Sequence, residues 1–233
     1  MNRFMKIGCA ALALAVAMPA FADDVEEGAV GWTPIAVGLA SPVQLPWGHA
    51  RWDVFGLDVN VLYTGAPKIY GLGVGGLGVY NADDAAGIVA SGICNWADKN
   101  VYGIRAAAVA NVCQGNVYGI EAGFVGYRKE FWGLDAALLG ALQEEIYGIQ
   151  ASFIGNVSRV KSYGWTAAFV ANLATKAYGC QTAFLFNGTE ELHGAQIAMV
   201  NYAQECPWGF QIGLINIIMD NSLKVLPFVN GYF

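Results

Sequence analysis

The chain has 233 residues, of which 56% are hydrophobic and 13% are charged, and 30 are glycine. A soluble domain ordinarily carries about 25% charged residues. The abundance of apolar residues excludes a disordered chain. A net charge of −6 without a basic cluster argues against nucleic acid as a partner.

The first residues have the pattern of a secretory signal peptide. Arg3 and Lys6 form a positively charged start, an apolar stretch follows at 7–18, and an A-x-A cleavage site ends at Ala22. The apolar stretch is too short to span a membrane comfortably. We therefore expect residues 1–22 to be removed on export, which predicts a location in the bacterial outer membrane or at the cell surface.

Residues 23–50 form an N-terminal segment that lies before the repeats. The segment starts with acidic residues and contains Pro34 within a weak alternation of apolar residues. Three roles remain open for it: filling the interior of the repeat domain, pairing with an edge strand, or crossing the periplasm.

A repeat of 14 to 16 residues occupies the remainder of the chain, which we assign to one repeat domain at 51–233. Each repeat carries a glycine that usually follows an aromatic residue, as in Tyr147-Gly148. A repeat that continues over this whole range leaves no room for a second domain. The repeat glycines are Gly56, Gly71, Gly87, Gly103, Gly119, Gly133, Gly148, Gly164, Gly179, Gly194 and Gly209.

Within each repeat, two kinds of residue alternate along the chain. In the repeat that starts at Tyr147, one face holds Tyr147, Ile149 and Ala151, and the other holds Gln150 and Asn156. The first face carries no charged residue in any repeat. Strict alternation of this kind is typical of β-strands with one apolar and one mixed face.

The strand length favours an all-β fold in which an antiparallel meander closes into a transmembrane β-barrel of about twelve strands. Ten or eleven residues rise roughly 35 Å, and a strand tilted by about 45° then climbs about 25 Å, the height of the apolar band of an outer-membrane barrel. Turns of about five residues are too short for a parallel crossover. This prediction makes outer-membrane lipid and the barrel assembly machinery the expected partners.

A β-solenoid of 15-residue coils is the alternative interpretation. Every repeat carries its glycine at the same position, as stacked parallel coils would, whereas antiparallel strands have no evident need for a glycine at each start. A coil of this length requires the strand to bend midway. The adjacent bulky pairs at 153–154, 169–170 and 184–185 are the candidate bends.

The last two repeats resemble a known repeat unit. Residues 209–216, Gly-Phe-Gln-Ile-Gly-Leu-Ile-Asn, are similar to the tandem Gly-Leu-Gln-Ile-Gly-Leu-x-Asn unit of a bacterial surface-repeat family of envelope proteins, and residues 194–201 are a looser copy. The tail at 217–233 also resembles the C-termini of that family. The resemblance implies an exported envelope or surface protein and implies no catalytic residues.

The polar residues of the mixed face are the candidate functional residues. In a barrel they line the lumen, where the acidic groups would favour cations in a passive small pore, or else they bond to one another in a sealed structural protein. In the solenoid interpretation the chain is a binding or interaction module. The predicted lumen-lining residues are Asp58, Arg105, Glu121, Asp135, Gln150, Thr166, Gln181, Gln196 and Gln211.

No constellation of catalytic, cofactor-binding or metal-binding residues is recognisable in the sequence. We therefore expect no enzyme activity, no cofactor and no metal site. Four cysteines follow the signal peptide, and their spacing leaves the disulfide pairing open, except that Cys113 and Cys206 are too far apart to bond in either fold. The four are Cys94, Cys113, Cys180 and Cys206.

Overall fold

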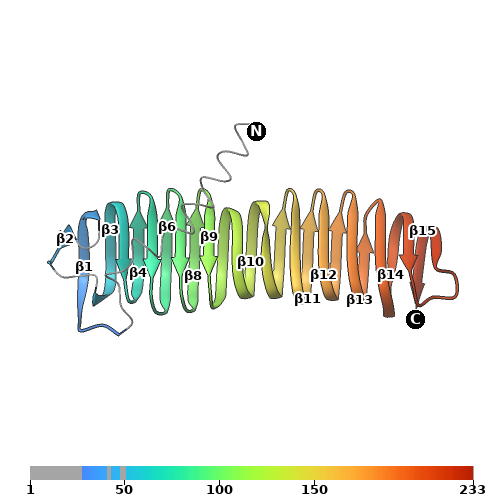
Figure 1. Cartoon of the computed structure of the whole chain (residues 1–233), viewed down its shortest axis with the longest axis horizontal. Helices are drawn as coiled ribbons and strands as arrows, with labels where there is room; N and C mark the ends of the chain where they lie inside the picture. Colours follow the sequence, from blue (N-terminus) through green and yellow to red (C-terminus); the bar gives the residue numbers. More distant parts are fainter. Residues whose placement is uncertain (1–27, 41–42, 48–50, 233) are drawn as a thin grey trace. The chain divides into compact units, whose positions relative to one another are not determined.

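The computed structural model describes residues 28–40, 43–47 and 51–232, and every helix or strand within these ranges is a β-strand (Figure 1). The predicted signal peptide lies outside the described residues. The chain divides into two compact units, Met1–Arg128 and Lys129–Phe233, and β10 contains residues of both. The strands are β1 (Gly31–Ala40), β2 (Val43–Leu45), β3 (Trp52–Ala66), β4 (Ile69–Gly75), β5 (Gly78–Asn81), β6 (Ala85–Ser91), β7 (Cys94–Ala97), β8 (Val101–Ala107), β9 (Ala110–Cys113), β10 (Asn116–Ser152), β11 (Gly155–Ala168), β12 (Ala171–Ala183), β13 (Phe186–Ile197), β14 (Val200–Ile218) and β15 (Val225–Tyr232).

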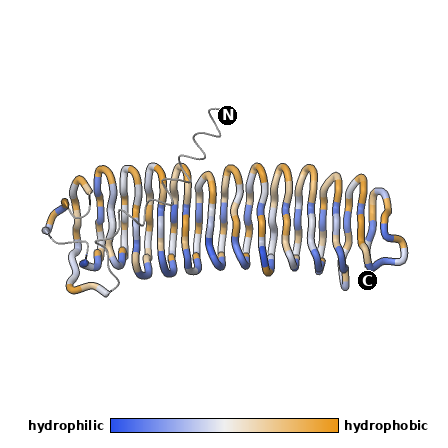
Figure 2. The backbone as a smooth tube through the Cα atoms, in the orientation of Figure 1, coloured by the Kyte–Doolittle hydropathy of each residue, from blue (hydrophilic) through white to orange (hydrophobic). Residues whose placement is uncertain are grey.

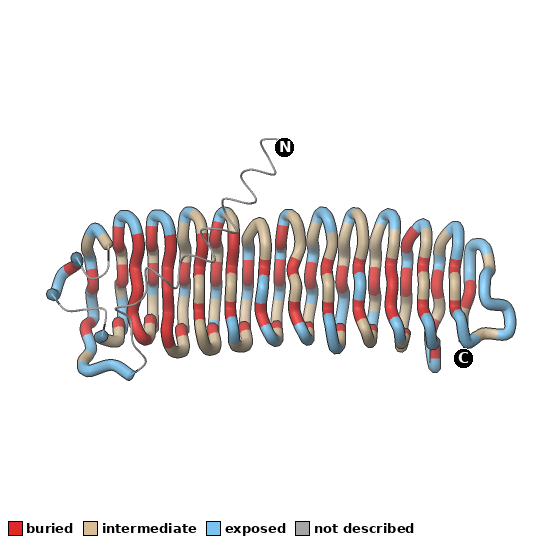
Figure 3. Tube along the Cα trace, in the orientation of Figure 1, coloured by how far each residue is buried: buried red, intermediate tan, exposed pale blue. Residues whose placement is uncertain are grey.

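In the first unit, each coil consists of a longer strand, a short bend and a shorter strand. The longer strand β4 and the shorter strand β5 stack in parallel on successive parts of β3. The pairs β6 with β7 and β8 with β9 continue the two rows. Both rows contain buried residues (Figure 3). Ile69 and Val89 of the longer strands share an apolar cluster with Val79 of a shorter one.

In the second unit, the coils follow the same plan with longer continuous strands. The end of β10 pairs in parallel with β11, and β11 to β14 follow one another in parallel. The chain bends between strands at residues 153–154, 169–170 and 184–185, which are the positions predicted for a solenoid. Close to the opposite turns, an interior apolar cluster includes Ala177, Leu192 and Cys206.

The predicted antiparallel barrel is wrong, and so are the transmembrane strands and the porin-like pore that followed from it. Successive coils pair in parallel with an offset of 14 to 16 residues, as in Asn187 with Asn201, Tyr163 with Tyr178 and Gly148 with Gly164. A barrel meander requires neighbouring strands to run in opposite directions. Short bends such as residues 153–154 and 169–170 reverse the chain inside a repeat, so the coil supplies its own return path and the chain is a β-solenoid.

The glycine column explains why the repeat tolerates no other residue at this position. All the repeat glycines have a positive φ, and within each unit successive ones stack on one another, as Gly71 does on Gly56 and Gly179 does on Gly164. At Gly179 φ is 127°, and a Cβ would lie 2.2 Å from the carbonyl oxygen of Gly164 in the preceding coil. Because only glycine adopts this backbone without strain and leaves room for that oxygen, the column allows the coils to stack closely.

The terminal strands depart from the parallel stacking. Strand β1, from the N-terminal segment, pairs in parallel with β3 and carries the antiparallel strand β2. At the other end, β15 pairs antiparallel with β14, and Pro227 lies beside a shift in their register. A residue without an N–H is tolerated at such an irregularity of an edge strand, and the reversed strand covers the edge of the last coil.

Candidate functional site

The nine residues predicted to line a lumen all have buried side chains, with exposed fractions of 5% or less. Their side chains point into the coils. The predicted alternation of inward and outward residues is therefore correct, although the predicted barrel is wrong. In the second unit, five of them stand in register and form one column. These five are Gln150, Thr166, Gln181, Gln196 and Gln211.

Hydrogen bonds from side-chain amides link the last three members of the column and join Gln150 to Asp135, whereas the hydroxyl of Thr166 has no hydrogen-bond partner among the described residues. Gln196 donates from Nε2 to Oε1 of Gln181 at 2.8 Å, and Gln211 donates to Oε1 of Gln196 at 2.8 Å. Gln150 donates to Oδ2 of Asp135 at 2.8 Å. A buried amide is costly unless it is paired, and each of these bonds forms only when the coils are in register. The column therefore holds the coils in place.

In the first unit, the predicted residues Arg105 and Glu121 belong to a buried charged cluster with Arg128. Nη2 of Arg105 lies 2.9 Å from Oε2 of Glu121, and Nη1 of Arg128 lies 2.8 Å from Oε1. The three side chains are 1% exposed or less. Arg128 was not among the predicted site residues, because the charged segment at 127–130 has the composition of a solvated turn.

Asp58 lies in a separate buried polar group of the first unit. Its Oδ1 accepts hydrogen bonds from the hydroxyl of Thr64 and from Nδ2 of Asn60. Burial disfavours the charged carboxylate and raises the pKa of Asp58 to about 6, although the hydrogen bond from Thr64 acts in the opposite direction. This group is therefore a buried titratable site.

A second column of amides, formed by asparagines, was not among the predicted site residues. Asn172 donates from Nδ2 to Asn187 at 3.1 Å, and Asn187 donates to Asn201 at 3.1 Å. Each also donates to a backbone oxygen of the following coil. The signal was present in the sequence, since an asparagine follows the repeat glycine by seven or eight residues in Asn156, Asn172, Asn187, Asn201 and Asn216.

On the outside of the second unit, the aromatic residues before the glycines form a ladder of stacked rings. The ring centroids of Trp132 and Tyr147 are 3.9 Å apart, and those of Tyr147 and Tyr163 are 4.9 Å apart. Tyr178 and His193 continue the ladder, each at 4.6 Å from the preceding ring. Because the rings cover one another's faces, the ladder presents ring edges rather than faces to a ligand.

The two edges of the second unit have opposite character, as Figure 2 shows by the hydrophobic colour of one row of turns and the hydrophilic colour of the other. The edge opposite the bends carries charged side chains, among them Lys176, Glu190, Glu191 and Glu205, and we call it the charged edge. Here Nζ of Lys176 lies 2.5 Å from Oε2 of Glu191. At the other edge, the bends expose large apolar side chains. We call these the apolar rim: Leu138, Phe153, Ile154, Phe169, Phe184, Leu185, Met199, Leu214 and Ile215.

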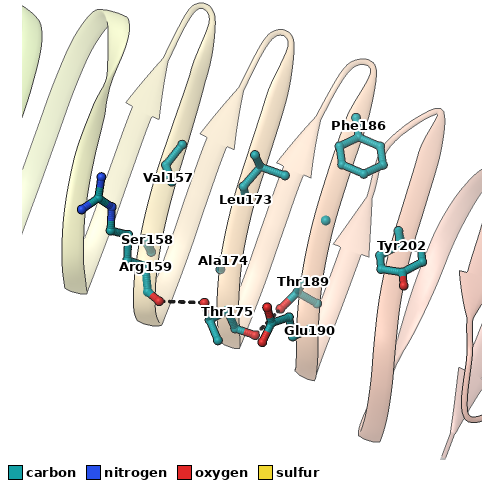
Figure 4. Close-up of a pocket in the computed structure, with 11 residues that line it drawn as sticks. Val157, Ser158, Arg159, Leu173, Ala174, Thr175, Phe186, Thr189, Glu190 and Tyr202 are labelled. Carbon is teal, nitrogen blue, oxygen red and sulfur yellow. Dashed lines mark hydrogen bonds between the residues drawn. The ribbon is translucent and has the colours of Figure 1, made fainter.

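A groove of about 380 Å³ lies on the outer surface of the second unit (Figure 4). Gly188 stands in register between Leu173 and Tyr202, and the ring of Phe186 lies over it, so a Cβ at this position would be 2.7 Å from that ring. The groove is apolar along most of its length and reaches Arg159 and Glu190 towards the charged edge. A second, wholly uncharged groove of about 450 Å³ adjoins the rim and is lined by Phe184, Ile197, Met199, Ile212, Leu214, Phe228 and Val229 among others.

The four cysteines in the described part of the chain are free thiols. Cys94, Cys113 and Cys206 are buried, and Cys180 is partly exposed. Burial raises the pKa of Cys94 and of Cys206 to about 11. A thiol that holds its proton so strongly is a poor nucleophile, so these cysteines act as small core residues.

Comparison with protein-family models, with curated proteins and with solved structures found no match for this chain. Within residues 28–40, 43–47 and 51–232, no group of three or more His, Cys, Asp or Glu residues is arranged to hold a metal ion. The same ranges contain no helix that is long and apolar enough to cross a membrane. The apolar rim, with its exposed side chains, is the candidate functional site of the second unit.

Proposed function

We propose that this chain is an exported β-solenoid repeat protein that acts as a non-catalytic interaction module and docks through its apolar rim. The observation that carries the proposal is the exposure of the rim, whose nine side chains are 38 to 56% exposed and uncharged. Monomeric proteins rarely expose a contiguous apolar patch larger than a few hundred Å² without a function for it.

The rim is contiguous because the coils repeat it. Neighbouring strands of a sheet lie about 4.8 Å apart, so successive bends bring Phe153, Phe169 and Phe184 side by side. The rings of Phe153 and Phe169 are stacked with centroids 5.1 Å apart, and those of Phe169 and Phe184 are 5.2 Å apart. The rim is thus one extended surface, and a docking partner contacts several coils at once.

The buried side chains of the second unit favour a structural role over a catalytic one. The buried glutamines and asparagines of the second unit bond to one another and to the backbone. Side chains that are engaged in this way hold the coils in register and are not presented to a substrate. An exported location is supported by the signal-peptide pattern at 1–22 and by the resemblance of residues 194–216 to an envelope repeat.

The test is the distribution of the protein in a bacterial host that exports it. We expect the wild-type chain to remain with the envelope fraction until detergent is added. The double variant Phe169→Gln/Phe184→Gln removes two rings from the rim, and we expect at least a tenfold larger share of it to be released without detergent. The matched control is Trp208→Gln, which removes an aromatic side chain that is 61% exposed but lies outside the rim.

The control is expected to distribute as the wild type does. Thermal unfolding of each purified variant checks that its fold is retained. An equal distribution of the wild type and the double variant would contradict docking through the rim.

A further inference from the structure

We infer that the binding partner of the apolar rim is the hydrocarbon region of a lipid layer. The bends of the second unit insert into this region, and its charged edge remains in water. The inference rests on the proposed function, because it names the partner of the same surface. It describes a peripheral protein that lies on one side of the lipid layer and does not span it.

The first argument is that polarity is inverted near the rim. Phe153 and Phe169 point outward at the bends, with exposed fractions of 55% and 48%. Immediately beside these bends, Gln150 and Asn156 point inward and are 2% exposed or less. A protein surrounded by water ordinarily places amides outside and rings inside. The reverse order fits a segment whose surroundings are less polar than its interior.

The second argument is that the backbone at the bends is already hydrogen-bonded from coil to coil. The N–H of Phe169 donates to the carbonyl of Phe153 at 3.1 Å, that of Phe184 to Phe169 at 3.2 Å, and that of Met199 to Phe184 at 3.1 Å. The asparagine column bonds further carbonyls on the inside, as Asn172 does to Thr182 at 2.8 Å. Hydrocarbon accepts a backbone only when its polar groups are satisfied internally, and these bends meet that requirement.

The same saturation argues against a partner that adds a strand. A peptide that extends a sheet needs free N–H and C=O groups on the edge that it joins. At the bends, these N–H and C=O groups already form hydrogen bonds with the neighbouring coils. What they present is apolar surface without directional contacts, which suits a fluid hydrocarbon phase.

The third argument is that the surface is uncharged on both sides of the rim. In the strands that precede the bends, the nearest outward residues include Ala151 and Ala167. In the strands that follow the bends, they include Val157 and Leu173. An interfacial protein segment is buried about 5–10 Å deep, which corresponds to two or three residues of a strand. A second copy of the chain would cover one side only, whereas a lipid layer surrounds the whole edge to that depth.

The charge of the protein indicates which lipid headgroups are compatible with binding at the rim. The chain has a net charge of −6, and the rim contains no lysine or arginine that would attract an anionic headgroup. Binding therefore depends on buried apolar area and not on electrostatic attraction. We expect zwitterionic lipid to be bound at least as well as anionic lipid.

The experiment is flotation of the purified full chain with phosphatidylcholine vesicles, at low salt and at about 1 M salt, where charge interactions are screened within about 3 Å. We expect the wild type to float equally at both salt concentrations. Because one buried aromatic side chain changes a partition coefficient by about tenfold or more, we expect Phe169→Gln/Phe184→Gln to lower vesicle binding at least tenfold. Trp208→Gln is expected to float as the wild type does.

Three results would overturn the inference. The first is a wild type that does not float, the second is flotation that requires added phosphatidylglycerol or is lost at high salt, and the third is a rim-dependent dimer in gel filtration that leaves no vesicle binding. If the rim variant is nevertheless released from the envelope in cells, the interaction module stands and its partner is a protein. If the rim variant stays in the envelope, the proposed function fails independently of the lipid result.

Discussion

Asn172 and Asn187 occupy the same position in consecutive coils, and Nδ2 of Asn172 donates to Oδ1 of Asn187 at 3.1 Å. Asn187 repeats the bond to Asn201 at 3.1 Å. It also donates to the backbone oxygens of Gln181 and Ile197, each at 3.0 Å. One amide thus connects its own coil to the next at the point where the chain bends, which fixes both the bend and the register.

The change Asn187→Ala tests how much the asparagine column stabilises the second unit. It removes the two N–H groups that Nδ2 shares among three oxygen acceptors and leaves buried carbonyl oxygens without a donor. We therefore expect the free energy of unfolding to fall by about 2–4 kcal/mol. The measurement is urea unfolding followed by circular dichroism. Gln204→Ala, at an exposed position of the charged edge, is the control and is expected to change stability by less than about 0.5 kcal/mol. Equal losses in the two variants would refute a structural role for the column.

The repeat period and the alternation of faces were predictable, but the direction of the strands was misread for a definite reason. The bend at Phe153 and Ile154 contains two residues, so the alternation continues with the same parity on both sides of it. Gln150 and Asn156, on either side of the bend, both point inward as the alternation predicts. Only Ile154, which a straight strand would place on the inner face, is 46% exposed. A straight strand and a bent coil therefore have nearly the same pattern.

The decisive signal was the glycine and not the alternation. In an antiparallel meander, equivalent residues of neighbouring strands lie at opposite ends, whereas parallel coils bring Gly164 and Gly179 directly together. The contacts of the buried side chains were less accessible to prediction. The ion pair between Glu121 and Arg128 joins residues whose side chains both enter the coil, and that orientation depends on where the turn begins. Composition does not locate that point.

The variant Gly179→Ala tests the close stacking of the glycine column. A Cβ would be placed 2.2 Å from the oxygen of Gly164, at a φ of 127° that alanine adopts only with strain. We expect a loss of about 2–5 kcal/mol, from overpacking and backbone strain together. Thermal unfolding measures it. The opposite change, Ala151→Gly at an exposed strand position, is expected to cost only about 0.5–1 kcal/mol. A loss no larger than that of Ala151→Gly would show that the coils can separate to accept a side chain.

The substitution Glu121→Gln tests the buried charged cluster of the first unit. It leaves the guanidinium groups of Arg105 and Arg128 without the carboxylate that neutralises them, at positions that are 1% exposed or less. We expect the free energy of unfolding to fall by about 3–5 kcal/mol. Denaturant titration is the measurement, and Glu190→Gln at an exposed position is the control, with an expected change of less than about 0.5 kcal/mol. Similar effects in both variants would mean that water reaches the cluster.

Asp58 gives the first unit a pH dependence that is opposite to that of an ordinary surface carboxylate. Its pKa is raised by burial from 3.8 to about 6, so between these values the folded chain keeps a proton that the unfolded chain has lost. The folded state is therefore favoured below pH 4, and this contribution is lost as the pH rises through 6. The two pKa values imply a change of about 3 kcal/mol across that window.

Asp58→Asn removes the titrating group and retains the oxygen that accepts bonds from Thr64 and Asn60. We therefore expect the stability of the variant, relative to the wild type, to increase by about 3 kcal/mol between pH 4 and pH 7. Urea midpoints at several pH values measure this difference, and the other carboxylates cancel because both proteins share them. Gln204→Ala, at an exposed position and without an ionisable group, should give a difference that is independent of pH. If the Asp58→Asn difference is also constant from pH 4 to pH 7, Asp58 is ionised in the folded chain throughout, and burial does not control its charge.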